Sequence, residues 1–128
     1  MKPAELLGKA SRAITSARLL LNAGDVDGAC NRAYYAMFDA ARARLIESGA
    51  PVTPESIKTH SGLIGMFSLH LVKPGVVTTE LGKSLNKVAE MRLIADYTED
   101  EITPDRAAWA VEQAATFVEA MRGPSAGK

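Results

Sequence analysis

The stretch "NRAYYAMFDAARARL", residues 31–45, combines two adjacent tyrosines, a phenylalanine and three arginines with many alanines. Its larger side chains recur every three or four residues, the spacing of one face of an α-helix. They are Asn31, Tyr34, Tyr35, Phe38, Arg42 and Leu45. This face is aromatic and polar at first and aliphatic at its end. The stretch therefore predicts a helix that is part core and part site, although tyrosines packed at a bundle edge would give the same pattern.

Turn and cap residues bound this helix and the one before it. Pro3 suits a first helical position, and Gly24 ends the first helix. Asp25 is placed to cap the second helix, which we expect over residues 26–48, with Gly49 as its stop.

Three further segments have helical signals. Thr53 can cap the first of them, which is weakened by Gly62 and Gly65, and Thr103 can cap the last. The predicted ranges are residues 56–71, 78–96 and 104–121. No segment alternates with period two for long enough to indicate a strand, and the connections are short. The sequence therefore predicts an all-α bundle with antiparallel neighbours, in one domain over residues 1–122 with a flexible tail over 123–128.

The composition excludes several classes of function. Of 128 residues, 15 are basic and 15 acidic, so any site for a polyanion must be a local cluster. A single cysteine, Cys30, excludes an internal disulfide, and His60 and His70 are too far apart on one helix to share a metal. We expect no metal site and no cofactor. Without a signal peptide or membrane-spanning run, a soluble cytoplasmic protein is expected.

The predicted fourth helix places a charge on an apolar stripe. Leu85 and Val88 lie on this stripe, and its next member is Arg92, followed four residues later by Asp96 and then by Tyr97. An arginine in this position needs a partner, which Asp96 could supply. Two interpretations stay open. The pair could only lock the helix end, or Asp96 could hold the guanidinium so that its fork meets a phosphate.

Three motifs in this order, "NRAYYAMFDAARARL", "KTHSGLIGMF" and "AEMRLIADYTED", resemble the small bacterial and archaeal HEPN domains. The resemblance covers nearly the whole chain. It implies an up-and-down antiparallel bundle of four long helices plus a short helix, usually dimeric. It also implies pairing with a minimal nucleotidyltransferase, often as a toxin–antitoxin module. Many members of the family are metal-independent ribonucleases, whose site is an arginine followed after four to six residues by a histidine.

The sequence departs from that ribonuclease pattern. Arg92 matches the family's arginine, but no histidine follows it, and Asp96 and Tyr97 stand in the histidine's place. An aspartate is a weaker base and adds negative charge where phosphate must bind. His60 could complete a site from the third helix, although a packing histidine is the simpler interpretation. Asp39 occupies a position at which relatives often have histidine, and its carboxylate makes the predicted cleft more acidic.

Three functions remain open. The first is a dimeric HEPN-like module that works with a nucleotidyltransferase and binds a nucleotide or RNA without efficient catalysis. Its predicted cleft consists of Asn31, Tyr34, Tyr35, His60, Arg92, Asp96 and Tyr97. The second is a toxin endoribonuclease that uses Arg92 with His60 or Asp96. The third is a purely structural dimerisation module, in which the cluster only stabilises the helices. Close approach between subunits in a dimer could use the alanine-rich second helix and the small residues of 107–118.

Overall fold

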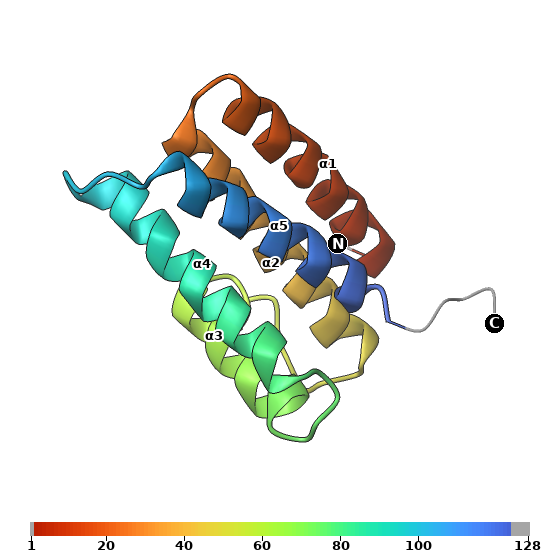
Figure 1. Ribbon diagram of the computed structural model, residues 1–128. Helices are drawn as coiled ribbons and strands as arrows, with labels where there is room; N and C mark the ends of the chain where they lie inside the picture. The colour runs from red at the N-terminus through yellow and green to blue at the C-terminus, as the bar shows by residue number, and fades with distance from the viewer. Residues whose placement is uncertain (1, 124–128) are drawn as a thin grey trace.

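The computed structural model describes residues 2–123, and within this range it contains helices and no strand. The elements are α1 (Pro3–Asn22), α2 (Val26–Glu47), α3 (His60–Phe67), the π-helix η1 (Ser68–Val72), α4 (Thr79–Tyr97) and α5 (Pro104–Met121). The four long helices alternate in direction, and α3 with η1 packs beside α4 (Figure 1). The prediction of an all-α bundle is confirmed. Of the predicted tail, residues 124–128 lie outside the described residues.

Helix α2 is the centre of the bundle. It packs against α1, α3, α4 and α5, and it is buried on nearly every side. Six of its alanines are almost fully buried: Ala29, Ala33, Ala36, Ala40, Ala41 and Ala43. Small side chains allow neighbouring helices to approach a helix closely from several directions. The alanines of α2 are thus used inside the chain, as are Ala107, Ala110 and Ala114 of α5, so the expectation of close approach between subunits is wrong for these residues. Ala108 and Ala115 of α5 are only partly buried.

The predicted ends of α2 and α5 are confirmed. The Asp25 carboxylate accepts a hydrogen bond from the backbone N–H of Gly28 at 2.9 Å. The Thr103 hydroxyl accepts one from the N–H of Arg106 at 3.2 Å. Gly49 follows α2 with φ +76°, a left-handed conformation that favours glycine.

The predicted start of the third helix is wrong. Thr53 and Ser56 bond reciprocally and close an irregular turn, in which the Thr53 N–H donates to Ser56 Oγ at 2.9 Å. This turn buries Ile57 in the core. Helix α3 begins four residues after Ser56, where Thr59 caps it by accepting from the N–H of Gly62 at 3.1 Å. The need to bury Ile57 thus displaces the helix start.

Beyond Phe67 the helix continues in a wider form to Val72. The N–H of Lys73 donates to the carbonyl of Ser68 at 2.8 Å, a five-residue span typical of a π-helix. Phe67 and Leu71 are both buried, so the wider turn keeps two large apolar residues on the core side.

The two glycines of α3 are expected to respond in opposite ways to alanine. A Cβ at position 62 would collide with the backbone oxygen of Ser56, whereas a Cβ at Gly65 would meet no atom within 4 Å. We predict that Gly62→Ala lowers the free energy of unfolding, and that Gly65→Ala raises it by up to about 1 kcal/mol through helix propensity. Urea denaturation of both variants tests this prediction, and destabilisation by Gly65→Ala equal to that by Gly62→Ala would contradict it.

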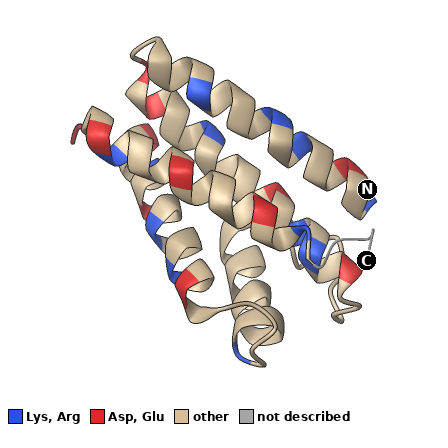
Figure 2. Ribbon diagram, turned by 45° about the vertical axis from the view of Figure 1, so that its right-hand side comes forward, with Lys and Arg blue, Asp and Glu red and all other residues tan. Residues whose placement is uncertain are grey.

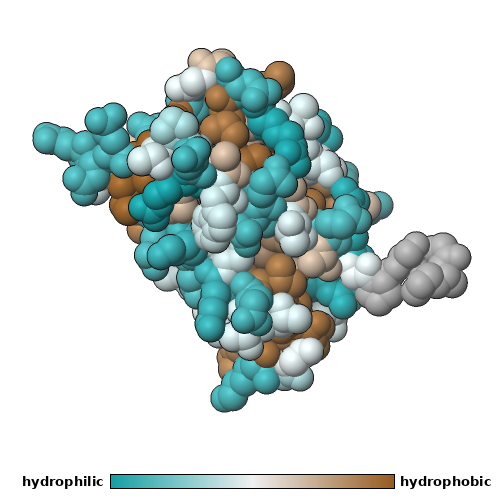
Figure 3. Space-filling view, viewed as in Figure 1, coloured by the Kyte–Doolittle hydropathy of each residue, from teal (hydrophilic) through white to brown (hydrophobic). Residues whose placement is uncertain are grey.

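The surface is mixed in charge and polarity. Basic and acidic residues are interspersed over the helices visible in Figure 2, and hydrophilic residues separate the apolar patches on the face in Figure 3. Within residues 2–123, none of the helices has the length and apolar character needed to cross a membrane.

Candidate functional site

A buried arginine on α4 lies at the centre of the predicted polar cluster. Leu85 and Val88 are buried on the same side of the helix, and Arg92, one turn further on, is only 4% exposed. As the sequence predicts, the guanidinium does not extend into solvent. A buried charge is strongly destabilising unless it is paired, so its neighbours determine what this arrangement can do.

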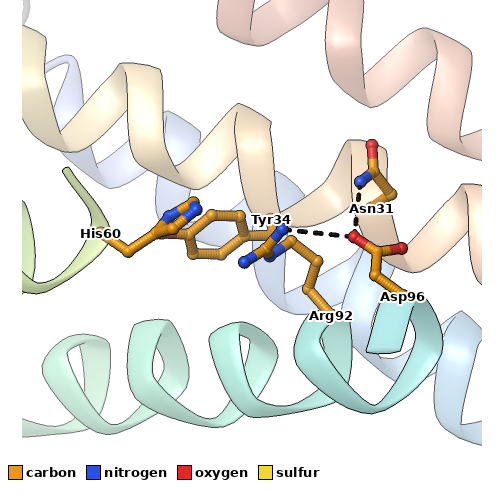
Figure 4. A network of polar contacts seen from close by, with 5 residues as sticks. All are labelled: Asn31, Tyr34, His60, Arg92 and Asp96. Atoms are coloured by element: carbon orange, nitrogen blue, oxygen red, sulfur yellow. Dashed lines mark hydrogen bonds and ion pairs between the residues drawn. The ribbon is translucent and has the colours of Figure 1, made fainter. Parts of the chain in front are cut away.

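Asp96 supplies the opposite charge. Nη1 of Arg92 lies 3.2 Å from Oδ2 of Asp96, and the same oxygen accepts a hydrogen bond from Nδ2 of Asn31 at 3.1 Å. One carboxylate oxygen therefore links α4 to α2 (Figure 4). The Asp96 side chain is 27% exposed, so water weakens the ion pair. Its main effect is to hold the guanidinium in one orientation.

Three tyrosine rings surround the guanidinium. Its central carbon lies 5.2 Å from the ring centre of Tyr34, 5.8 Å from that of Tyr35 and 5.7 Å from that of Tyr97. All three distances are within the range of cation–π attraction. Tyr34 is fully buried, whereas Tyr97 is 73% exposed. The arginine thus rests on aromatic surface and lies beside an exposed phenol.

His60, the first residue of α3, joins the cluster through Tyr34. The Tyr34 hydroxyl lies 2.5 Å from Nδ1 of His60, and the two ring centres are 5.1 Å apart. In Figure 4 the Tyr34 ring lies between the imidazole and the guanidinium. The residues that the sequence selects are therefore brought together, and we call them the Arg92 cluster: Asn31, Tyr34, Tyr35, His60, Arg92, Asp96 and Tyr97.

Burial changes the proton affinities within the cluster. It raises the pKa of Tyr34 to about 12, although the charge of Arg92 opposes the rise. Burial, and secondarily the charge of Arg92, lowers the pKa of His60. Near neutral pH the phenol therefore keeps its proton and the imidazole is neutral. A hydroxyl that donates to Nδ1 leaves the proton of His60 on Nε2, which then cannot act as a base.

The lowered pKa of His60 predicts a pH dependence of stability. Because the folded state disfavours the imidazolium, the unfolded chain binds more protons, and stability is lost as pH falls below the ordinary histidine value of about 6.5. We expect the free energy of unfolding to fall from about pH 7 to about pH 5, and to fall less steeply in His60→Gln. Urea denaturation across this range measures the slope, with His70→Gln as the control. Equal slopes in the native and His60→Gln proteins would contradict the prediction.

Phe38 belongs beside the cluster, although sequence reasoning leaves it out of the site. Its ring centre lies 5.7 Å from that of His60, 5.9 Å from that of Tyr34 and 6.1 Å from that of Tyr35. The signal was present, because Phe38 follows the two tyrosines by three and four residues on the same helix face. The aromatic surface is thus one turn longer than predicted.

The side chains of the cluster contact one another directly. A hollow of about 540 Å³ lies elsewhere, between α1, α2 and α5, with Leu7, Arg44 and Met121 in its lining. A ligand would meet the cluster at its members that are not buried, which are Asn31, Tyr35, His60, Asp96 and Tyr97. Among residues 2–123, no group of three or more histidine, cysteine, aspartate or glutamate side chains could hold a metal ion.

The chain is similar to proteins of one domain family. Residues 4–123 match the model of the HEPN domain. The UPF0332 protein glr0978 of Gloeobacter violaceus is 33% identical over 93 residues, which cover 73% of this chain and 70% of that protein. A UPF0332 protein of Thermotoga maritima is 37% identical over 91 residues, 71% of this chain and 65% of that protein. "Putative toxin MJ0605" of Methanocaldococcus jannaschii is 32% identical over 117 residues, 91% of this chain and 84% of that protein.

Proposed function

The chain belongs to the HEPN domain family, and on this basis we propose that it is a helical module that acts with a minimal nucleotidyltransferase in a toxin–antitoxin pair. Its role in the pair is to bind a nucleotide or an RNA end at the Arg92 cluster, without efficient catalysis of its own. The observation that carries the proposal is the buried guanidinium of Arg92, which Asp96 orients.

The cluster offers chemistry suited to a nucleotide. A guanidinium held by a carboxylate keeps other N–H donors, and its planar fork matches a phosphate. Tyr35 and Tyr97 present partly exposed rings close to it, on which a base can stack. Because the net charge is near zero, this local arrangement, and not overall attraction, would supply the affinity.

The expectation of weak catalysis rests on the position of the histidine. Cleavage of RNA through the 2′-hydroxyl needs a base beside the phosphate. No histidine follows Arg92, and the Tyr34 ring separates His60 from the guanidinium. Asp96 is engaged by both Arg92 and Asn31. Within one chain, therefore, neither His60 nor Asp96 is available as a base beside a phosphate bound at Arg92.

A toxin endoribonuclease is the second candidate, favoured by the contact of His60 with the cluster and by relatives whose names call them toxins. It requires the tautomer in which Nδ1–H donates to the Tyr34 oxygen, leaving Nε2 as the base. It predicts growth arrest on expression that Arg92→Ala relieves. RNA that stays intact after long incubation with the purified protein would exclude this candidate.

Exposed apolar side chains beside the cluster support a protein partner and a homodimer. Leu93 is 48% exposed and Tyr97 73% exposed, one turn apart on α4. We expect sedimentation to show a dimer at micromolar concentration, and a monomer would contradict that part of the proposal. A gene for a small nucleotidyltransferase beside this one, and co-purification of the two products, would support the pairing.

Nucleotide binding is tested most simply with AMP, with inorganic phosphate as the control. Millimolar AMP is expected to change tyrosine fluorescence and to shift the amide resonances of residues 31–35 and 92–97. The hollow lined by Leu7, Arg44 and Met121 supplies internal reference resonances that should not move. If AMP leaves the cluster resonances unchanged, the nucleotide-binding part of the proposal is wrong.

A further inference from the structure

Two arginines share an unusual feature. Among the described residues, Nε of Arg42 and Nε of Arg92 are the buried side-chain nitrogen or oxygen atoms that lack a hydrogen-bond partner. Buried polar groups in proteins nearly always have a partner, so each exception requires an explanation. Both of these exceptions lie on guanidinium groups at the edge of one aromatic surface.

Arg42 resembles Arg92 in its surroundings. Its central carbon lies 5.7 Å from the ring centre of Phe38. Its Nη1 lies 3.6 Å from Oδ1 of Asp39, which is ion-pair distance but too long for a hydrogen bond. The Arg42 side chain is 25% exposed, so its outer nitrogens reach solvent. An acceptor from outside could therefore bind this guanidinium.

The aromatic side chains connect the two arginines. Arg42 contacts the ring of Phe38 and Arg92 contacts the ring of Tyr34, and these rings lie 5.9 Å apart, one turn along α2. His60 packs against both rings. The two guanidinium groups thus contact successive rings of one continuous aromatic row, Arg42 at Phe38 and Arg92 at Tyr34.

Asp39 is the acidic neighbour of Arg42. Asp39 is 8% exposed. Burial raises the pKa of its carboxyl, while the charges of Lys9 and Arg42 lower it. Arg42 is thus the cation at ion-pair distance from this carboxylate. The negative charge that Asp39 was expected to add to the cleft is offset by its own neighbours.

We propose that Arg42 binds a second phosphate of a short single-stranded nucleic acid whose first phosphate is bound by Arg92. The nucleoside between them lies over the partly exposed rings of Tyr35 and His60. This inference rests on the proposed function, because it assigns the ligand of the same site. It adds a length requirement: the preferred ligand carries at least two phosphates joined by a nucleoside.

The test compares ligands with one and two phosphates in matched variants. AMP and 5′-phosphorylated diadenylate, in ribose and deoxyribose forms, are titrated into the native protein, Arg42→Gln and Arg44→Gln. Arg44 is the control, because it lies on the same helix but lines the hollow shared with α1 and α5. Thermal unfolding of each variant verifies that it is folded, and Arg42→Lys tests whether charge alone is sufficient.

We expect Arg42→Gln to weaken diadenylate binding about tenfold, the loss of one charge-assisted contact, while AMP binding stays unchanged. The slope of log affinity against log salt should fall by about 0.7, the value for one phosphate on a single strand. Ribose and deoxyribose forms should bind alike if phosphates and bases alone are contacted. A preference for ribose would place a contact at the 2′-hydroxyl and identify RNA as the source.

Three results would overturn the proposal. Diadenylate could bind no more tightly than AMP, Arg42→Gln could weaken both ligands equally, or Arg44→Gln could have the same effect as Arg42→Gln. In each of these cases AMP still binds the native protein, so the proposed function survives. If neither AMP nor diadenylate binds the native protein, the nucleotide-binding function fails and this inference fails with it.

Discussion

Replacing Arg92 by leucine is expected to abolish nucleotide binding while it changes the free energy of unfolding by no more than about 1 kcal/mol. Leucine can fill the space beside Tyr34 and Tyr35 with apolar contacts. The Asp96 carboxylate that loses its partner is 27% exposed and keeps the hydrogen bond from Asn31, so water can solvate it. Stability and function should therefore separate at this one position.

Urea denaturation and AMP titration of the same preparation measure both effects. Arg92→Lys is the matched control, because it keeps the charge and loses the planar fork. It should bind AMP more weakly than the native protein and more tightly than Arg92→Leu. If Arg92→Leu binds AMP as well as the native protein, the cluster is purely structural, and the third interpretation of the sequence becomes the correct one.

Replacing Tyr34 by alanine should have the largest effect on stability, a loss of about 3–5 kcal/mol in the free energy of unfolding. Tyr34 is fully buried on α2, the helix against which α1, α3, α4 and α5 all pack. Its ring contacts Phe38, His60 and the guanidinium of Arg92. Alanine would leave a cavity that these rigid neighbours could fill only in part.

Two further variants separate the ring of Tyr34 from its hydroxyl. Tyr34→Phe keeps the ring and loses the hydrogen bond to His60, so a loss of about 1 kcal/mol is expected. Tyr97→Ala removes a ring that is 73% exposed, and its effect should stay within about 0.5 kcal/mol. If Tyr34→Ala and Tyr97→Ala lower the free energy of unfolding equally, the result would contradict the description of Tyr34 as buried and Tyr97 as exposed.

The sequence was informative wherever one residue type has one physical use. Asp25, Gly49 and Thr103 mark helix ends because their backbone and side-chain chemistry suits those positions. Arg92 on an apolar stripe required an acid one turn away, and Asp96 is that acid. These local rules predicted the helices and the centre of the cluster.

Sequence reasoning failed where tertiary packing decides. Thr53 and Thr59 are equally good caps, and only the burial of Ile57 selects Thr59. The alanines of α2 read as a surface for another subunit, because the sequence does not reveal that helices cover α2 on several sides. Arg42 lies on the helix face that the sequence predicts, but the sequence does not show that its guanidinium packs over the ring of Phe38.

The most direct test of the central claim is the side-chain Nε–H resonance of Arg92. In the free protein this nitrogen is buried and has no hydrogen-bond partner, and we predict that added AMP shifts its resonance in a saturable way. The Nε–H resonance of Arg44 should remain in place in the same titration. An Arg92 resonance that stays unchanged at millimolar AMP would show that no phosphate binds this guanidinium, and would contradict the account.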